Sequence, residues 1–370
     1  MMGNTPNIRF KGFTDDWEQR KLGDIASDMV AGGDIDKDLI LAEGQYPVIA
    51  NALTGDGIVG YYDKEYRVNA PAVTVTGRGD VGHAKARLVN FTPVVRLLSV
   101  KSEHDVFFLE NAINTLKIVI ESTGVPQLTV PQLAKYEVAF PRQLDEEEHI
   151  GVFFKQLDHL ITLHQRKCDE TKKLKKFMLQ KMFPKKDEKK PEIRFAGFTD
   201  DWEQRKLGEV FQEYSEKNHP ELPALTIIQG GGTVLREKSE RKLQYDKSSL
   251  AWYKMVREDD FIVHLRSFEG GLEKSNHNGL ISPAYHTFHG DEVDSRFYYP
   301  YFRSYEFIKH KLVPHVYGIR DGRSIDIDGM KTIEIPWTSY EEQKKIGDYI
   351  ESLDTLITLH QRKSFFIFSI

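Results

Sequence analysis

The sequence predicts a mixed α/β (α+β) protein with two similar domains and two long helices, because one plan appears twice along the chain. IRFKGFTDDWEQRKLGDI begins at Ile8 and returns from Ile193 as IRFAGFTDDWEQRKLGEV, identical at 15 of 18 positions. LDHLITLHQRK at 157–167 returns at 353–363 as LDTLITLHQRK, identical at ten of eleven. The copies lie 185 and 196 residues apart. Solenoid repeats recur every ~20–50 residues, so this spacing indicates an internal duplication instead.

The second repeat predicts the two long helices. Acidic residues crowd the start of each and basic residues the end, as the helix dipole favours. The first helix, about Asp145 to Met182, would be ~57 Å long, and the second, Glu341 to about Lys363, ~35 Å. Apolar positions at alternating spacings of three and four define a seam on each helix. The expected seam, also a candidate surface for partner subunits, comprises Ile150, Phe153, Leu157, Leu160, His164, Ile346, Tyr349, Leu353, Leu356 and His360.

Matching seams predict that the helices pack as an antiparallel coiled coil, which gives the duplicated chain an approximate twofold axis. The alternative is two unrelated surface helices, each lying on its own domain. We interpret His164 and His360 as hydrogen-bonded core histidines rather than metal ligands. After Lys363 the second copy reads SFFIFSI. We therefore expect a truncated second helix, with Phe365–Phe368 either folding back over the first helix or marking a shortened variant.

The blocks between the repeats share almost no sequence, yet strand and helix patterns fall in matching places. Strands are expected at 46–50, 71–77, 135–141, 224–230, 260–267 and 332–337, and helices at 105–122 and 295–312. The two blocks therefore read as one fold with different surfaces. The expected divisions are a first domain at 1–140, a long helix at 141–184, a basic linker at 185–192, a second domain at 193–335 and a second helix at 336–370.

Composition indicates a soluble, reducing, cytoplasmic setting without a membrane segment. Apolar residues make up 40% of the chain, and no apolar run approaches the roughly 18 residues that a membrane span needs. One cysteine, Cys168, excludes a disulfide framework. The net charge is −5, with −4 in 26–140 and −2 in 211–335, whereas 166–190 has 11 basic and 4 acidic residues, net +7. This balance argues against a free-standing, non-specific DNA binder.

Motifs for catalysis are missing from the sequence. No Gly-Lys dipeptide occurs, so there is no phosphate-binding P-loop, and His286-x-x-His289 alone is a weak metal signal. Two glycine triplets, Gly55-x-Gly57-x-x-Gly60 and Gly77-x-Gly79-x-x-Gly82, match the dinucleotide fingerprint. That fingerprint needs a following helix, and strand-like sequence follows both triplets. We interpret them as loops between strands, and predict a chain without metal, cofactor or catalytic residue of its own.

Basic and amide side chains near these loops could reach a groove of DNA, although solvated surface hairpins would look the same. The candidates are Arg78, His83, Lys85 and Arg87 in the first block, and Arg266, Lys274, Asn276, His277, Arg320 and Arg323 in the second. Arginine and lysine suit guanine, and asparagine suits adenine. Trp17 and Trp202, inside the first repeat, are expected to pack the entry to each domain.

The layout resembles the specificity subunit of type I restriction–modification enzymes. The resemblance rests on GFTDDWEQRKLGD before each block, VPQLTVPQLAKYEVAFP at the end of the first, and the EEEHIG…LDHLITLHQRK helix. It implies two target recognition domains, each reading one half of a split double-stranded DNA target, with the helix pair as a ruler. It also implies docking of two methylation subunits and, through them, two restriction subunits. S-adenosylmethionine, ATP and Mg²⁺ would belong to those partners.

Two other functions are compatible with parts of the sequence. A two-domain protein–protein adaptor with no DNA role fits the acidic balance and the helix pair, but gives no reason for two divergent blocks in one duplicated frame. A nucleotide-binding enzyme would have to use the glycine triplets, and predicts nucleotide binding by the isolated chain.

Overall fold

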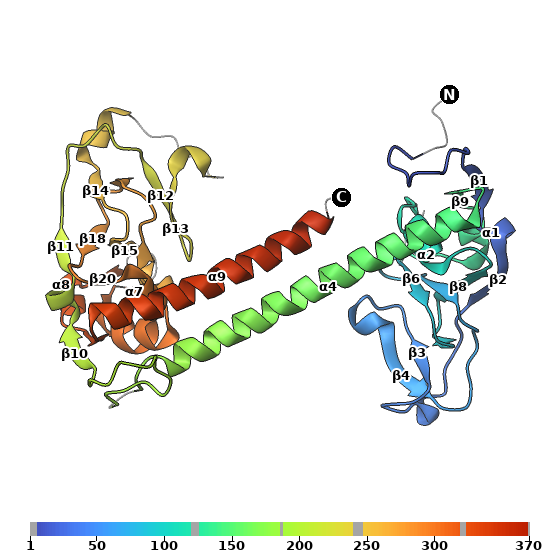
Figure 1. Ribbon diagram of the computed structural model, residues 1–370, viewed down its shortest axis with the longest axis horizontal. Helices are drawn as coiled ribbons and strands as arrows, with labels where there is room; N and C mark the ends of the chain where they lie inside the picture. The colour runs from blue at the N-terminus through green and yellow to red at the C-terminus, as the bar shows by residue number, and fades with distance from the viewer. Residues whose placement is uncertain (1–5, 120–125, 186–187, 240–246, 319–322, 369–370) are drawn as a thin grey trace. The chain divides into compact units, whose positions relative to one another are not determined.

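The computed structural model describes residues 6–119, 126–185, 188–239, 247–318 and 323–368 (Figure 1). The chain divides into two compact units, Met1–Leu163 and His164–Ile370, each with its own hydrophobic core. The division falls inside the long helix α4, Leu144–Lys181. The two variable blocks expected from the sequence therefore lie one in each unit.

The first unit is built mainly of short antiparallel strands. A four-stranded sheet has the order β2-β8-β5-β6, a three-stranded sheet has the order β4-β3-β7, and β1 pairs with β9. The elements are β1 Glu18–Lys21, α1 Leu22–Ile25, β2 Ala26–Ala31, β3 Tyr46–Ile49, β4 Ile58–Tyr62, β5 Ala72–Thr76, β6 Ala84–Arg87, β7 Thr92–Pro93, β8 Leu97–Ser102, α2 Val106–Asn114, α3 Val130–Leu133 and β9 Glu137–Phe140.

The second unit repeats this plan after α4. A four-stranded sheet has the order β11-β18-β15-β16, and β10 pairs with β21. The elements are β10 Glu203–Lys206, α5 Leu207–Val210, β11 Gln212–Tyr214, β12 Leu225–Ile228, β13 Gly232–Leu235, β14 Lys254–Val256, β15 Phe261–Val263, α6 Ser267–Gly270, β16 Glu273–Lys274, β17 Gly279–Ile281, β18 His286–His289, α7 Ser295–Phe302, β19 Val316–Tyr317, β20 Ser324–Ile325, α8 Ile327–Lys331, β21 Glu334–Trp337 and α9 Tyr340–Phe368.

The two variable blocks share one fold, as the sequence predicts. When the four strands of each four-stranded sheet are numbered by their order along the chain, both sheets have the order first, fourth, second, third. The flanking pair has the same register in both units, with Glu18 opposite Phe140 and Glu203 opposite Trp337. Both glycine triplets lead into strands, β4 and β6, so neither presents the helix N-terminus that a dinucleotide site needs.

Both helices expected inside the blocks end earlier than their apolar patterns predict. The helix expected at 105–122 ends at Asn114, whose side-chain amide forms hydrogen bonds to the backbone N–H and carbonyl of Ala84. Residues 120–122 of that prediction lie outside the described residues. The helix expected at 295–312 is divided into α7 and a π-helical turn at Phe307–Leu312. Side-chain hydrogen bonds and a change of helix type leave no mark in hydrophobic periodicity.

The first repeat anchors the start of each long helix. In the first unit, the Arg9 guanidinium donates two hydrogen bonds to Glu146, with Nη2 to Oε2 at 2.7 Å. The indole N–H of Trp17 reaches the same carboxylate at 3.4 Å. Glu146 is only 1% exposed, in the first turn of α4. The carboxylate therefore ties the repeat to the helix.

The second copy forms the same anchor. Arg194 donates to both carboxylate oxygens of Glu342 at 2.6 and 2.8 Å, and Trp202 donates to Glu342 at 3.0 Å. Trp202 is 3% exposed and contacts Phe297, so the prediction that this tryptophan packs the domain entry is confirmed. The repeated residues hold each helix against its domain.

The cores of the two units differ in composition. Aliphatic residues dominate the first core, which includes Val73, Val75, Leu98, Val100 and Ile113. Aromatic residues are much more frequent in the second, in which Phe211, Phe261, Tyr298, Phe302 and Phe307 are all fully buried. One backbone plan is thus filled by two different sets of side chains.

Within the second unit, the C-terminal part of α4 packs antiparallel to α9 (Figure 1). His164 meets His360 with their Nδ1 atoms 3.1 Å apart, and further along Lys175 pairs with Asp354 at 2.5 Å. His164 and His360 are equivalent residues of the duplicated segment, so the seam brings a residue against its own copy. The predicted antiparallel coiled coil is confirmed, together with both histidines as hydrogen-bonded seam residues.

The seam on α9 lies one residue away from part of the prediction. Ile346 and Leu353 are buried as expected, but Ile350 at 4% exposure takes the place expected for Tyr349, which packs on Phe195. Leu356 is 44% exposed, so its expected place in the helix seam is wrong. Adjacent apolar residues in the repeat allow two registers, and the sequence does not choose between them.

The same correction applies to the expected seam on α4. Leu160 and Phe153 are 41% and 39% exposed, whereas Ile161 is buried. Phe153 contacts Phe10 of the first repeat, and Ile150 packs against the first core. Leu157 is partly buried. The N-terminal part of α4 thus follows its own domain at Ile150, and Leu160, like its copy Leu356, is largely exposed.

The second helix is longer than expected. α4 matches its predicted bounds within one residue, but α9 continues to Phe368 instead of ending near Lys363. The fold-back expected for Phe365–Phe368 is wrong, because the backbone stays helical through these residues. Apolar residues without proline or glycine extend a helix that is already nucleated.

Acid is expected to weaken the helix pair through His164. Burial, followed by the charges of His360, Lys363 and Lys167, lowers the pKa of His164 below its ordinary value. The unfolded chain then binds the proton first as the pH falls through about 6.5, so stability is lost below that pH. Denaturant unfolding at about pH 8 and 5.5 should show a smaller acid loss in His164→Gln than in the native chain. An equal loss in both, or the same relief in the exposed control His159→Gln, would contradict this assignment.

Candidate nucleic-acid interface

Three of the predicted residues in the first unit lie together at one cleft. His83, Lys85 and Arg87 lie on or beside β6, the edge strand of the four-stranded sheet. With the tip of the β3–β4 hairpin, including Leu53 and Asp56, they line a cleft of 330 Å³. The structure therefore gathers basic side chains between a strand edge and a hairpin tip.

The cations of this cleft are held to different degrees. Lys85 is 52% exposed and its Nζ lies 4.0 Å from Glu110 Oε1. Burial raises the pKa of Glu110, and the nearby Lys85 charge opposes that rise. Arg87 donates from Nε to the Thr74 hydroxyl at 3.0 Å, and burial lowers the pKa of this guanidinium. Lys85 is thus free to reach a ligand, whereas Arg87 is fixed in the wall.

Arg78 is not part of this cleft. It is exposed in the loop between β5 and β6, and its backbone pairs with Gln127. The sequence placed it with His83 and Lys85 because all three lie near the second glycine triplet. The turn at that triplet separates their side chains.

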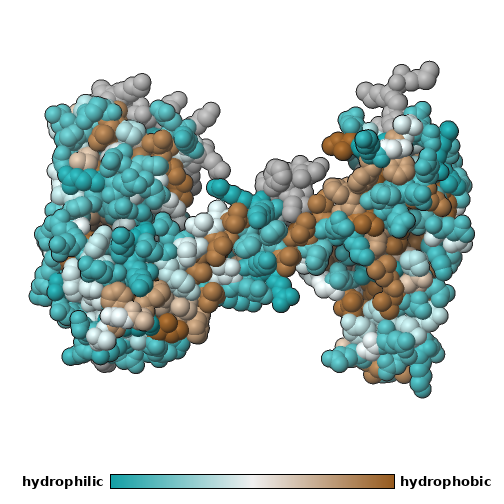
Figure 2. All heavy atoms as spheres, viewed as in Figure 1, coloured by the Kyte–Doolittle hydropathy of each residue, from teal (hydrophilic) through white to brown (hydrophobic). Residues whose placement is uncertain are grey.

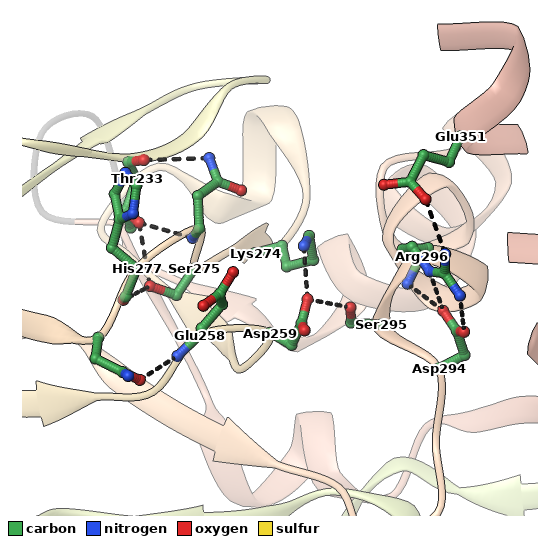
Figure 3. A network of polar contacts seen from close by, with 12 residues as sticks. Thr233, Glu258, Asp259, Lys274, Ser275, His277, Asp294, Ser295, Arg296 and Glu351 are labelled. Carbon is green, nitrogen blue, oxygen red and sulfur yellow. Dashed lines mark hydrogen bonds and ion pairs between the residues drawn. The ribbon is translucent and has the colours of Figure 1, made fainter. Parts of the chain in front are cut away.

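In the second unit, Lys274 and Asn276 are held by other parts of the fold, and Figure 3 shows Lys274 beside Asp259. Lys274 donates to Asp259 at 2.7 Å, and Asp259 also accepts a hydrogen bond from Ser295. The amide nitrogen of Asn276 donates to the carbonyls of Gly231 and Thr233 at 2.9 and 3.1 Å. These bonds would have to break before the Asn276 amide could read a base.

The remaining candidates are on exposed loops. His277 is exposed, and its carbonyl accepts a hydrogen bond from Ser275. Arg266 is exposed just before α6, and Arg323 lies 5.8 Å from the ring centre of Phe268 in that helix. The structure thus brings Arg323 to the segment that Arg266 precedes. Arg320 lies outside the described residues.

A wide groove runs beside Lys274 and Asn276 in the second unit. Its volume is 1100 Å³, and its walls include Gly230 at the tip of the β12–β13 hairpin and Arg303 after α7. Lys172, Lys175 and Lys176 of α4 also line this groove. Lys175 is paired with Asp354, whereas Lys172 and Lys176 have no ion-pair partner among the described residues. The basic stretch noted in the sequence therefore borders this groove.

Sequence reasoning missed the hairpin that closes over β16. This hairpin has Gly230 and Gly231 in its turn and Gly232 as the first residue of β13. Its amides bind Glu273, a carboxylate with no exposed surface. The run of three glycines was the available signal, but an isolated buried glutamate has none.

No grouping of three or more His, Cys, Asp or Glu side chains within the described ranges could hold a metal ion. His286 pairs with Glu213 at 2.7 Å and His289 with Asp260 at 2.5 Å, so these two histidines have separate protein partners. Across the same described ranges, no helix has both the length and the apolar character to cross a membrane.

Comparisons with known proteins agree with the duplicated fold. A family model described as "Type I restriction modification DNA specificity domain" matches residues 14–173. A putative type I specificity subunit of Mycoplasma pneumoniae is 31% identical over 133 residues, which are 35% of this chain and 36% of that protein. This match therefore spans only about a third of the relative's length.

Two longer matches cover nearly the whole chain. The specificity subunit of the type I restriction enzyme MjaVIII of Methanocaldococcus jannaschii is 24% identical over 385 residues, covering 94% of this chain and 88% of that protein. The crystal structure of a type I restriction–modification S subunit from M. genitalium aligns with 100% of this chain and 96% of its own, with a TM-score of 0.65 and 14% identity. The structural likeness shows the shared fold. Residues 14–173 thus match the DNA specificity domain of type I restriction–modification systems, the sequence relatives are type I specificity subunits, and the chain has the fold of a solved S subunit.

Proposed function

We propose that this chain recognises a split double-stranded DNA target, with one half-site read by each variable domain. The observation that carries this proposal is that the same fold occurs twice in the chain with different residues in its loops. The two domains share strand order, flanking strand pair and Arg–Trp–Glu anchor, whereas their loop residues differ. Two domains with the same fold but different exposed residues are suited to recognise two different DNA sequences.

Phosphate and base contacts would come from different residues. Contacts to phosphates position a protein on DNA, and contacts to base edges give specificity. In the first domain, His83 and Lys85 at the cleft are the proposed base contacts. In the second, Arg266 and Arg323 are exposed enough for this role, and Lys172 and Lys176 of α4 would meet phosphates.

The repeated segments would dock two copies of one methylation subunit. Near-identical sequence is needed where two surfaces meet the same partner, and exposed apolar residues fit such contacts. Leu160 and its copy Leu356 are exposed in this way, and Figure 2 shows apolar side chains at the surface of the long helices. The chain itself would be non-catalytic, with S-adenosylmethionine on the methylation subunits, and ATP and Mg²⁺ on the restriction subunits. The helix pair would set the gap between half-sites.

Mapping methylated adenines tests this proposal. The chain is expressed with its neighbouring methylation subunit in a host that lacks such systems. We expect a single split motif, two short specified halves around a fixed unspecified gap. Assembly of the two proteins without methylation at a split motif would contradict the proposal and favour the adaptor function.

Salt dependence gives a second prediction. Lys172→Ala with Lys176→Ala should weaken DNA binding of the assembled complex on all sequences and reduce the slope of log affinity against log salt by about 2. Lys173→Ala, an exposed lysine on the same helix that does not line the groove, should leave most of the slope unchanged. Equal effects of the groove and control variants would contradict a phosphate-binding role for the groove.

A further inference from the structure

We propose that the β12–β13 hairpin is the base-reading element of the second domain, with Gln229 as a specificity-determining residue and Glu273 as the residue that positions it. This inference rests on the proposed DNA-recognition function. It adds a recognition element that the basic side chains alone did not indicate.

The hairpin presents a rigid, exposed tip. Gly230 and Gly232 have φ values of +82° and +71°, a backbone region that favours glycine. A side chain at Gly232 would also meet the carbonyl of Lys274 at 2.5 Å. The two residues just before Gly230 are exposed: Ile228 is 44% exposed, and Gln229 is exposed with no hydrogen bond from its amide to any described residue.

Glu273 fastens this tip from below. Its carboxylate accepts hydrogen bonds from the backbone N–H of Gly230 at 2.7 Å and of Gly232 at 3.2 Å. The same carboxylate accepts a hydrogen bond from the Tyr299 hydroxyl at 2.8 Å and is paired with Arg303. Four donors thus satisfy one buried anion, which is the condition for a buried charge to be tolerated.

A second set of bonds holds the ascending strand of the hairpin. The Thr233 hydroxyl lies 3.1 Å from that of Ser275 (Figure 3) and accepts a hydrogen bond from the backbone N–H of Asn276 at 2.9 Å. The Asn276 amide closes the turn by bonding Gly231 and Thr233. Asn276 therefore contributes to recognition by shaping the hairpin.

The first domain carries the opposite charge at the equivalent position. Thr74 of β5 faces Lys85 of β6, and Ile262 of β15 faces Glu273 of β16, with the neighbouring strands in the same register. Lys85 is half exposed beside an open cleft, whereas Glu273 is buried beneath a bonded hairpin. At the same position of the edge strand, Lys85 is available to a ligand in the first domain, whereas Glu273 holds the β12–β13 hairpin in place in the second.

The hairpin has the dimensions and chemistry to read DNA. The major groove admits a two-stranded β-ribbon, and glutamine pairs with adenine through N6 and N7. Gly230 at the tip lines the same wide groove as Lys172 and Lys176. A ribbon entering the major groove would therefore have cations nearby for the flanking phosphates.

The test is methylation mapping of the full complex with Gln229→Ala. We expect about tenfold or greater loss of discrimination at one adenine-containing position of the second half-site, with the first half-site unchanged. Glu273→Gln should relax several positions of the same half-site, because an amide cannot accept from four donors as a carboxylate does. The exposed control Glu237→Gln should leave both half-sites unchanged.

The first half-site is an internal control for assembly and catalysis by the partner. An unchanged motif with Gln229→Ala, or equal relaxation of both halves, would overturn the inference. Gln229 is exposed, so this test does not depend on whether Glu273→Gln folds. Absence of a split motif with the native chain would instead contradict the proposed function.

Discussion

Replacing Glu342 with alanine is expected to lower the free energy of unfolding of the second unit by about 3–5 kcal/mol. The Glu342 side chain is 1% exposed and that of Arg194 is 13% exposed. Removing the carboxylate leaves a nearly buried guanidinium and the Trp202 N–H without their acceptor. Breaking such a pair from one side leaves the partner charge uncompensated, which is more harmful than replacing both residues.

Urea unfolding measures this effect, with Glu341→Ala as the matched control. Glu341 is the preceding residue and is exposed, so its loss should change stability by less than about 0.5 kcal/mol. Glu146→Ala, at the equivalent anchor of the first unit, should behave like Glu342→Ala. Similar stabilities of the Glu341 and Glu342 variants would show that the anchor does not hold the helix.

The second large effect is expected from Phe302→Ala, which should lower the free energy of unfolding by about 3–5 kcal/mol. Phe302 is fully buried at the centre of the aromatic core. Its ring centre lies between 4.9 and 5.8 Å from those of Phe211, Phe261, Tyr298, Tyr301 and Phe307. Truncation removes these contacts and leaves a cavity that rigid rings cannot close.

Tyr305→Ala is the control for this prediction, because it removes another aromatic ring three residues later that is 71% exposed. Thermal or urea unfolding of both variants gives the comparison. A loss below about 1 kcal/mol for Phe302→Ala would mean that the surrounding core repacks, contrary to the expected rigidity.

The duplication made much of the fold predictable. Repeats separated by 185 and 196 residues indicated two equivalent halves, and the structure has the same strand order in both. The residues of the helix seams were predicted less well, because the segment LITL contains adjacent leucine and isoleucine residues, and either one could face the partner helix. Tertiary packing selected Ile357, one residue after the exposed Leu356.

The candidate DNA-binding site was predictable from the sequence only where basic residues are clustered along the chain. His83, Lys85 and Arg87 do lie together, since they occupy or adjoin one short strand. The role of Glu273 was not predictable, because it depends on β16 lying beneath a turn more than 40 residues earlier in the chain. Asn276 looked like a base-reading amide, but the same turn engages its donors.

The most direct test of two independent readers is to replace block 211–335 with a second copy of block 26–140 and map methylation with the native partner. If each block reads its own half-site, the first half of the native target should appear twice, in inverted orientation, around a fixed gap. Retention of the native second half-site by this exchanged chain would contradict recognition of one half-site by each domain.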